Sequence, residues 1–296
     1  MQTYRQASPV FPVSSNPCAP DTFMFFVNLT LRAVHGDPKR LDSFIAKRLN
    51  PELGMDPLML DSLPLAWHGE TARRIQDAGL ACSVHLPFFD LQPGSVDPLV
   101  IDAARTRLRH AMDTATVYQP RHLIAHAAYD RFLYIHSYQH WRDRAAQTFA
   151  LALKSWPEHP PLFLENTHET SPIHVAGLAE ALAELSPGLV RTGICFDVGH
   201  WYSFGEGHSK NHLTDWLDVF APHLGHLHLH DNDGSFDHHL GLGHGSIPWK
   251  TVFAELAKRS LTPTVTFEPH TPEDIRQTLE FTAEHPDWFA PLGVTV

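Results

Sequence analysis

The stretch that decides the fold is GHLHLH (225–230), which runs into DNDGSFDHHLGLGHG (231–245). His226, His228 and His230 alternate with leucines. Because successive side chains of a β-strand point to opposite faces, the three histidines share one face and the leucines share the other. Leucines suit a face packed against helices. The pattern therefore predicts a buried strand with its histidines directed into an interior.

Seven further short runs alternate with longer segments of helical period, which is typical of βα units around a parallel sheet. The eight runs are FMFFVNL (23–29), ELGMD (52–56), ACSVHL (81–86), HLIAH (122–126), LFLEN (162–166), GICFD (193–197), GHLHLH (225–230) and TVTFE (264–268). The clearest helical segments cover 67–79, 97–118, 137–156 and 247–260. Eight strands close a barrel. We predict an α/β protein, a (β/α)8 TIM barrel, with an N-terminal extension (1–22) and a single barrel domain (23–296).

The charge composition narrows the classes of molecule that the protein is expected to bind. The 296 residues carry 22 Lys and Arg against 33 Asp and Glu, a formal net charge of −11. This balance disfavours nucleic acid and anionic lipid, so we expect a small-molecule substrate. Three cysteines without CxxC spacing (Cys18, Cys82 and Cys195) suit a reducing compartment. We see neither a signal peptide nor a membrane span and expect a cytoplasmic protein; the oligomeric state stays open.

Strand parity places a polar side chain at the carboxyl end of each strand from the third to the eighth. These residues are His85, His126, Glu165, Asp197, His228 and Glu268. In a TIM barrel this end carries the active site. Buried carboxylates and imidazoles facing one axis need a compensating charge, which a divalent cation supplies. Mixed oxygen and nitrogen ligands suit Zn, Mn, Co or Fe(II) better than Ca.

Loop residues extend this set. His200 follows Asp197 by three residues, and Asp237 and His239 alternate toward one side, so all three are further ligand candidates. We expect His226 and His230 to line the barrel interior and His238 and His244 to be solvated. The candidates for contact with substrate are Trp201, Phe88 and His230.

Taken together, these motifs resemble the xylose isomerase-like TIM-barrel superfamily over residues 23–270. The matching segments are HLP (85–87), His126, LEN (164–166), FDVGH (196–200), HLHDN-x-G (228–234), D-x-H (237–239), LGxG (242–245) and FEP (267–269). The sugar isomerase and epimerase branch implies one divalent metal, for which Zn, Mn, Co and Mg are candidates, held by Glu165, Asp197, His228 and Glu268. In that chemistry Glu165 and Glu268 exchange a proton with a carbon next to a polarised carbonyl. Ketose 3-epimerases carry an arginine shortly after the metal histidine, and residues 231–249 contain none.

The endonuclease IV branch of the same superfamily implies three zinc ions. His85, His126 and Glu165 would hold the first ion; Glu165, Asp197, His228 and Glu268 the second; and His200, Asp237 and His239 the third. In that chemistry a metal-bridging hydroxide attacks a phosphodiester. The acidic chain offers no basic surface for duplex DNA, so this alternative becomes a zinc phosphoesterase of a small phosphoester.

The function that we predict is a metal-dependent isomerase or epimerase of a sugar or sugar phosphate, with one to three divalent ions per chain. The multinuclear phosphoesterase is the alternative. A barrel that binds metal or ligand without turnover is a third reading, which the completeness of the ligand set and the presence of both glutamates disfavour.

Overall fold

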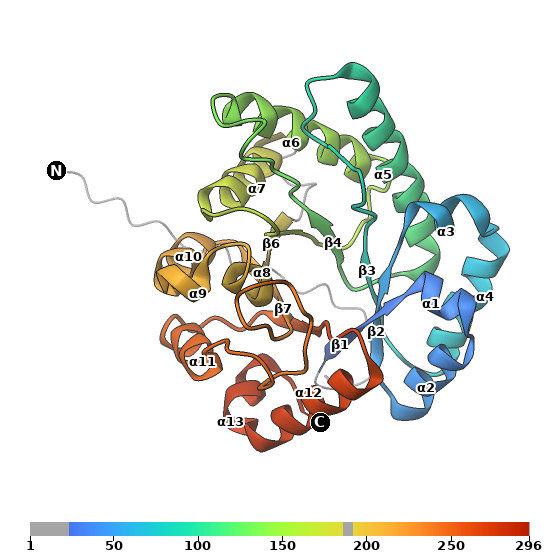
Figure 1. The fold of residues 1–296 in the computed structure, drawn as a ribbon. Helices are drawn as coiled ribbons and strands as arrows, with labels where there is room; N and C mark the ends of the chain where they lie inside the picture. The colour runs from blue at the N-terminus through green and yellow to red at the C-terminus, as the bar shows by residue number, and fades with distance from the viewer. Residues whose placement is uncertain (1–23, 186–191, 296) are drawn as a thin grey trace.

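A closed barrel of eight parallel strands forms the centre of the molecule in a computed structural model that describes residues 24–185 and 192–295 (Figure 1). The strands are β1 (Phe25–Thr30), β2 (Asn50–Gly54), β3 (Ser83–His85), β4 (Leu123–His126), β5 (Leu162–Glu165), β6 (Thr192–Asp197), β7 (Leu224–Leu229) and β8 (Thr264–Phe267). They pair in chain order, and β8 returns to β1 through the register Phe26 to Thr266. The predicted TIM barrel is confirmed, and each predicted strand overlaps an observed one.

Helices surround the barrel (Figure 1). They are α1 (Leu31–Gly36), α2 (Lys39–Lys47), α3 (Pro57–Ser62), α4 (Leu65–Asp77), α5 (Pro98–Tyr118), α6 (Tyr138–Lys154), α7 (Ile173–Leu185), α8 (Val198–Tyr202), α9 (Gly207–Lys210), α10 (Leu213–Phe220), α11 (Trp249–Lys258), α12 (Pro272–Glu284) and α13 (Pro286–Phe289), followed by the 3-10 helix η1 (Ala290–Leu292). The four predicted helices correspond to α4, α5, α6 and α11. The α5 helix begins where expected, because the Asp97 side chain accepts the backbone N–H of Leu99 and a proline occupies the first turn.

The alternation in β7 separates two environments. Leu227 and Leu229 belong to the apolar core between the strands and the helices. His226 and His228 point into the barrel, since both lie within 4 Å of Glu52 on β2, across the barrel. All four side chains are fully buried. The sequence pattern therefore predicts the two faces of this strand correctly.

Further predictions concern the N-terminal extension, the cysteines and membrane spans. The extension 1–22, with Cys18, lies outside the described residues. Cys82 and Cys195 are buried and carry no disulfide. Within residues 24–185 and 192–295, the model contains no helix with the length and apolar character needed to cross a membrane.

Candidate metal centre

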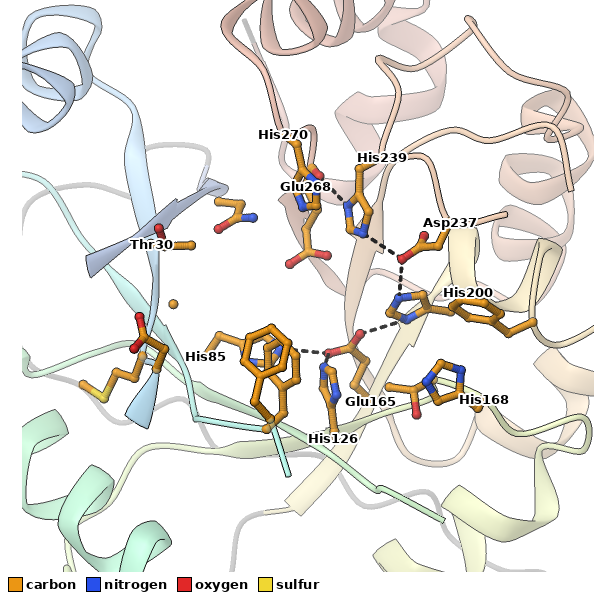
Figure 2. Close-up of a pocket in the computed structure, with 18 of the residues that line it drawn as sticks. Thr30, His85, His126, Glu165, His168, His200, Asp237, His239, Glu268 and His270 are labelled. Atoms are coloured by element: carbon orange, nitrogen blue, oxygen red, sulfur yellow. Dashed lines mark hydrogen bonds and ion pairs between the residues drawn. The ribbon is translucent and has the colours of Figure 1, made fainter. Parts of the chain in front are cut away.

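Nine acidic and histidine side chains meet at the carboxyl end of the barrel strands, and Figure 2 shows seven of them, all except Asp197 and His228. We call this set the mouth cluster, and it consists of His85, His126, Glu165, Asp197, His200, His228, Asp237, His239 and Glu268. Five members lie on β3 to β7, and Glu268 directly follows β8. The other three come from α8 and from the loop between β7 and α11. The structure brings all nine predicted ligand candidates together.

Glu165 lies at the centre of the mouth cluster. Its Oε2 atom is 3.1 Å from Nε2 of His85 and 3.4 Å from Nε2 of His126. Its Oε1 atom is 3.1 Å from Nδ1 of His200, on the other side of the carboxylate (Figure 2). The carboxylate is 1% exposed. Glu165 therefore links two groups of histidines through its two oxygens.

His228 is the point on which three carboxylates converge. Its Nδ1 atom lies 3.4 Å from Oε2 of Glu268, 3.6 Å from Oε2 of Glu165 and 3.8 Å from Oδ2 of Asp197. None of these contacts is a hydrogen bond of standard geometry, and His228 Nδ1 is buried without a partner among the described residues. These four side chains form the acid-rich middle of the cluster.

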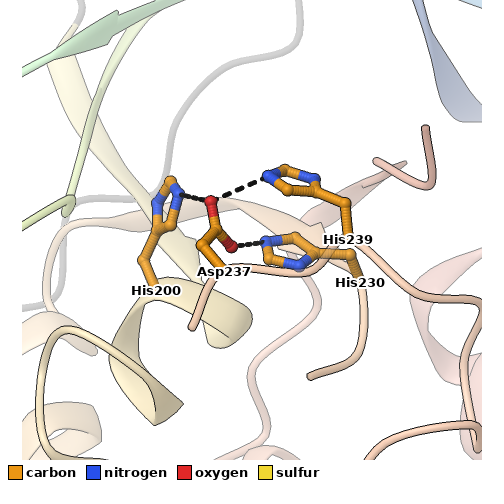
Figure 3. A group of neighbouring side chains, drawn as sticks. All are labelled: His200, His230, Asp237 and His239. Atoms are coloured by element: carbon orange, nitrogen blue, oxygen red, sulfur yellow. Dashed lines mark hydrogen bonds and ion pairs between the residues drawn. The ribbon is translucent and has the colours of Figure 1, made fainter. Parts of the chain in front are cut away.

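A third group surrounds Asp237 (Figure 3). Its Oδ2 atom lies 3.0 Å from Nε2 of His239 and 3.3 Å from Nε2 of His200, and its Oδ1 atom lies 3.7 Å from Nε2 of His230. His230 was predicted to contact substrate. In this structure the side chain is fully buried against Asp197 and stacks on His239 at 3.8 Å, and its contact with substrate stays a prediction.

Local structure explains how these loop residues reach the cluster. Asp197 ends β6 and also caps α8, because its Oδ1 atom accepts the backbone N–H of His200 at 2.6 Å. This capping bond places His200 on the first turn of the helix. Gly199 makes room for the ring of His230, since a Cβ atom there would lie 2.0 Å from Cε1 of that ring.

The long loop after β7 is held by another buried carboxylate. Asp231 accepts the backbone N–H groups of Gly243 and Ile247 and the indole N–H of Trp249. It also forms an isolated antiparallel bridge with Leu240. These bonds fold the loop back over the strand end, so Asp237 and His239 face the cluster. His238 and His244 are exposed, as predicted.

Burial and neighbouring charges give the titratable groups of the mouth cluster different pKa values. Burial raises the pKa of Glu268 to about 7. For Glu165 burial acts in the same direction, but the neighbouring charges of His126 and His228 hold its pKa well below the usual range. Burial opposes the protonation of His200, yet Asp197 and Asp237 raise its pKa well above that of free histidine. Burial lowers the pKa of His126 to about 4.

The donor set fits divalent cations. Three groups that combine members of the mouth cluster with two neighbours, Glu52 and His230, have ligand atoms within 4.8 Å of one another: His85, His126 and Glu165; Glu52, His228 and Glu268; and His200, His230, Asp237 and His239. Buried atoms without a hydrogen-bond partner include Nδ1 of His228 and Oδ1 of Asp237. Imidazole and carboxylate together suit Zn, Mn or Co. Such ions would satisfy these atoms and offset the charge of the carboxylates.

A cavity of about 710 Å³ opens above the mouth cluster and includes Glu165, Asp237 and Glu268 in its lining (Figure 2). Its aromatic lining residues are Phe88, Phe89, Phe204 and Phe236. The one lysine or arginine among the described lining residues is Arg32, which is paired with Asp56 at 3.0 Å.

Comparison of the sequence with known protein families agrees with the barrel fold. The family described as xylose isomerase-like TIM barrel matches residues 52–285. The chain belongs to this family. A curated relative, the uncharacterized protein MJ1311 of Methanocaldococcus jannaschii, is 25% identical over 206 residues, which cover 68% of this chain and 69% of the relative.

Solved structures of the xylose isomerase-like fold include both enzyme branches. The TTHB071 protein of Thermus thermophilus, from a crystal soaked with ZnCl2, has a TM-score of 0.67 and 26% identity, covering 91% of this chain and 98% of that one. D-psicose 3-epimerase has a TM-score of 0.65 and 13% identity over 86% and 93%. Endonuclease IV of Thermus thermophilus has a TM-score of 0.61 and 18% identity over 90% and 98%. The last two likenesses show the fold alone.

The two aromatic residues predicted to contact substrate have different positions in this barrel. Phe88 lines the cavity and stacks on His126 at 4.1 Å. Trp201 is not among the described lining residues of this cavity, and its contact with substrate stays a prediction. The indole is fully buried in α8, packs on Phe196 and directs its N–H toward His212.

Two buried polar residues of the xylose isomerase-like barrel were missed. Glu52 on β2 and His122 just before β4 are 1% and 3% exposed inside the barrel. With Ser83, His226, Thr264 and Thr266 they form a layer beneath the mouth cluster, which we call the floor. Its signal in the sequence was faint, because NPELG (50–54) carries a single inward acid and a proline.

Proposed function

We propose that this chain is a metal-dependent isomerase or epimerase that acts on a sugar. The placement of Glu165 and Glu268 carries the proposal. They come from β5 and from the end of β8, and their Oε2 atoms lie 3.6 Å and 3.4 Å from the same nitrogen of His228. Both acids also line the cavity. Two carboxylates at one cavity are what an enzyme needs to remove a proton from carbon and return it.

A bound divalent ion, held by Glu165, Asp197, His228 and Glu268, would polarise the carbonyl and hydroxyl oxygens of the sugar and so acidify the intervening C–H bond. One glutamate carboxylate removes the carbon-bound proton. For epimerisation, the other glutamate delivers a proton to the same carbon from the opposite face. For isomerisation, a proton is delivered to the neighbouring carbon, and the hydroxyl proton moves to the former carbonyl oxygen. The number of bonds and protons is conserved in either case.

The cavity lining favours an uncharged substrate. Arg32 is already paired with Asp56, so no described lysine or arginine of the lining is left for a phosphate. Aromatic walls such as Phe88 and Phe204 suit the C–H faces of a sugar ring. We therefore favour a neutral sugar over a sugar phosphate.

The test is incorporation of solvent deuterium. A panel of ketoses is incubated in D2O with Mn-loaded or Co-loaded protein, and the products are analysed by NMR. We expect deuterium at the carbon that changes configuration, and we expect Glu268→Gln to abolish the exchange. Turnover without incorporation, or no turnover of any ketose or ketose phosphate, would contradict the proposal.

A second candidate, a multinuclear zinc phosphoesterase of small phosphoesters, is favoured by one observation. Glu165 contacts His85 and His126 through one oxygen and His200 through the other, as expected of a carboxylate that bridges metal ions. Elemental analysis of protein purified without chelators separates the two. One Mn, Co or Mg per chain supports the isomerase, about three zinc ions support the phosphoesterase, and no metal contradicts both.

A further inference from the structure

Glu52 is a buried carboxylate whose two oxygens have different surroundings. Its Oε2 atom accepts hydrogen bonds from the hydroxyls of Ser83 at 2.9 Å and Thr266 at 2.7 Å. Its Oε1 atom has no hydrogen bond of standard geometry and lies 3.1 Å from Nε2 of His228. A buried carboxylate oxygen left unpaired is costly, so this orientation needs a reason.

His228 lies between the floor and the mouth cluster. Nδ1 is directed at the carboxylates of Glu268, Glu165 and Asp197, and Nε2 is directed at Glu52. The ring is fully buried, so water does not compete for either nitrogen. A neutral imidazole carries one N–H, and the partner of one nitrogen decides whether the other has a free lone pair.

We propose that Glu52 is a positioning residue that accepts the Nε2–H of His228 and thereby directs the lone pair of Nδ1 into the mouth cluster. The 3.1 Å between Nε2 of His228 and Oε1 of Glu52 is within hydrogen-bond distance. Carboxylates that accept the second N–H of a metal-binding histidine fix both its tautomer and its orientation.

The other buried histidines of the floor do not fill this role. His226 is occupied at both nitrogens, with Nδ1 2.7 Å from the hydroxyl of Thr264 and Nε2 2.9 Å from that of Thr266. His122 is nearest to the other oxygen of Glu52, at 3.7 Å. Among the described residues, His228 is the histidine placed to use Oε1.

This inference rests on the proposed function only in that His228 is a metal ligand, and it applies equally to one or three ions. A protein that binds metal as expected but exchanges no deuterium would contradict the isomerase and leave the role of Glu52 standing. The two proposals therefore fail by different measurements.

The first test is metal affinity. In Glu52→Gln we expect the Kd for Zn²⁺ or Co²⁺ to rise by about 10- to 100-fold, the usual effect of removing such a partner, and we expect the Co²⁺ absorption spectrum to change. Ser83→Ala is the matched control, since it removes a buried hydrogen bond from the other oxygen and should leave the affinity within about twofold. Equal affinities and spectra in Glu52→Gln and wild type would overturn the proposal.

The second test needs no variant of Glu52 and so does not depend on its folding. Nitrogen-15 NMR of the zinc-loaded wild-type protein, with the His228 signals assigned by their loss in His228→Asn, reports which nitrogen carries hydrogen. We expect a proton on Nε2 and none on Nδ1. A proton on Nδ1, or a wild-type protein that binds no metal, would overturn the proposal.

Discussion

The mouth cluster and the floor are both polar and buried, yet they are satisfied in opposite ways. In the floor, hydroxyls of Ser83, Thr264 and Thr266 bond to Glu52 and His226. The mouth cluster consists of carboxylates and imidazoles alone. In it, Nδ1 of His228 has no hydrogen-bond partner among the described residues. The floor is thus hydrogen-bonded through its own hydroxyls except at Oε1 of Glu52 and Nε2 of His122, whereas a cluster built only of carboxylates and imidazoles calls for a cation.

The change expected to break the mouth cluster most severely is Glu165→Gln. Loss of the central carboxylate removes a ligand and a proton-transfer group, so we expect little bound metal and a fall in kcat of about 10⁴-fold. Elemental analysis and steady-state kinetics on the same preparation measure both. His244→Ala, in an exposed position of the loop that carries Asp237, should change neither. Full metal content in Glu165→Gln would show that metal binding by the mouth cluster does not depend on the carboxylate of Glu165.

Lowering the pH should weaken metal binding by the mouth cluster, and the floor should not respond in the same way. Burial raises the pKa of Glu268 to about 7, and Asp197 and Asp237 raise that of His200 against the opposing effect of burial. Both groups therefore hold protons below these raised pKa values, and a metal ion must displace them. We expect affinity to fall by about tenfold per pH unit for each proton displaced. Calorimetry in buffers of different ionisation enthalpy measures the proton release, and a pH-independent Kd would contradict it.

The floor is tested by Thr266→Val, which keeps the shape of the side chain and removes its hydroxyl. Glu52 and His226 each lose a buried partner, so we expect the free energy of unfolding to fall by about 1 to 3 kcal/mol. Urea denaturation of the metal-free protein provides the measurement. Metal stoichiometry should stay at the wild-type value, because the hydroxyl contacts no member of the cluster except through Glu52. Loss of metal would show that metal binding by the mouth cluster depends on the hydrogen bonds of the floor.

The smallest effect is expected at the rim of the cavity, outside both layers. Phe236 lines the cavity and is 61% exposed. A contact from such a partly exposed ring is worth about 0.5 to 1 kcal/mol, so Phe236→Ala should raise KM by roughly two- to fivefold. The expected kcat and metal content are those of the wild type. A fall in kcat at constant KM would instead connect Phe236 with the chemical step.

The same contrast explains what could be predicted from the sequence. Alternation in β7 is local, so the inward direction of His226 and His228 was predictable, as was the gathering of strand-end residues once the barrel was assumed. The floor was not, because its bond between Thr266 and Glu52 joins residues 214 apart and forms only when the barrel closes. The burial of Trp201 was not predictable either, because helix α8 begins directly after Asp197 and turns the indole into the core.

The closure of β8 against β1 has a consequence for how the molecule is made. Members of the mouth cluster are spread along the chain from His85 to Glu268, so a nascent chain that stops short of β8 displays an incomplete set of ligands. The full set exists only after the last strand has docked between β7 and β1. If the cluster binds metal as proposed, tight metal binding would therefore be confined to chains whose barrel has closed.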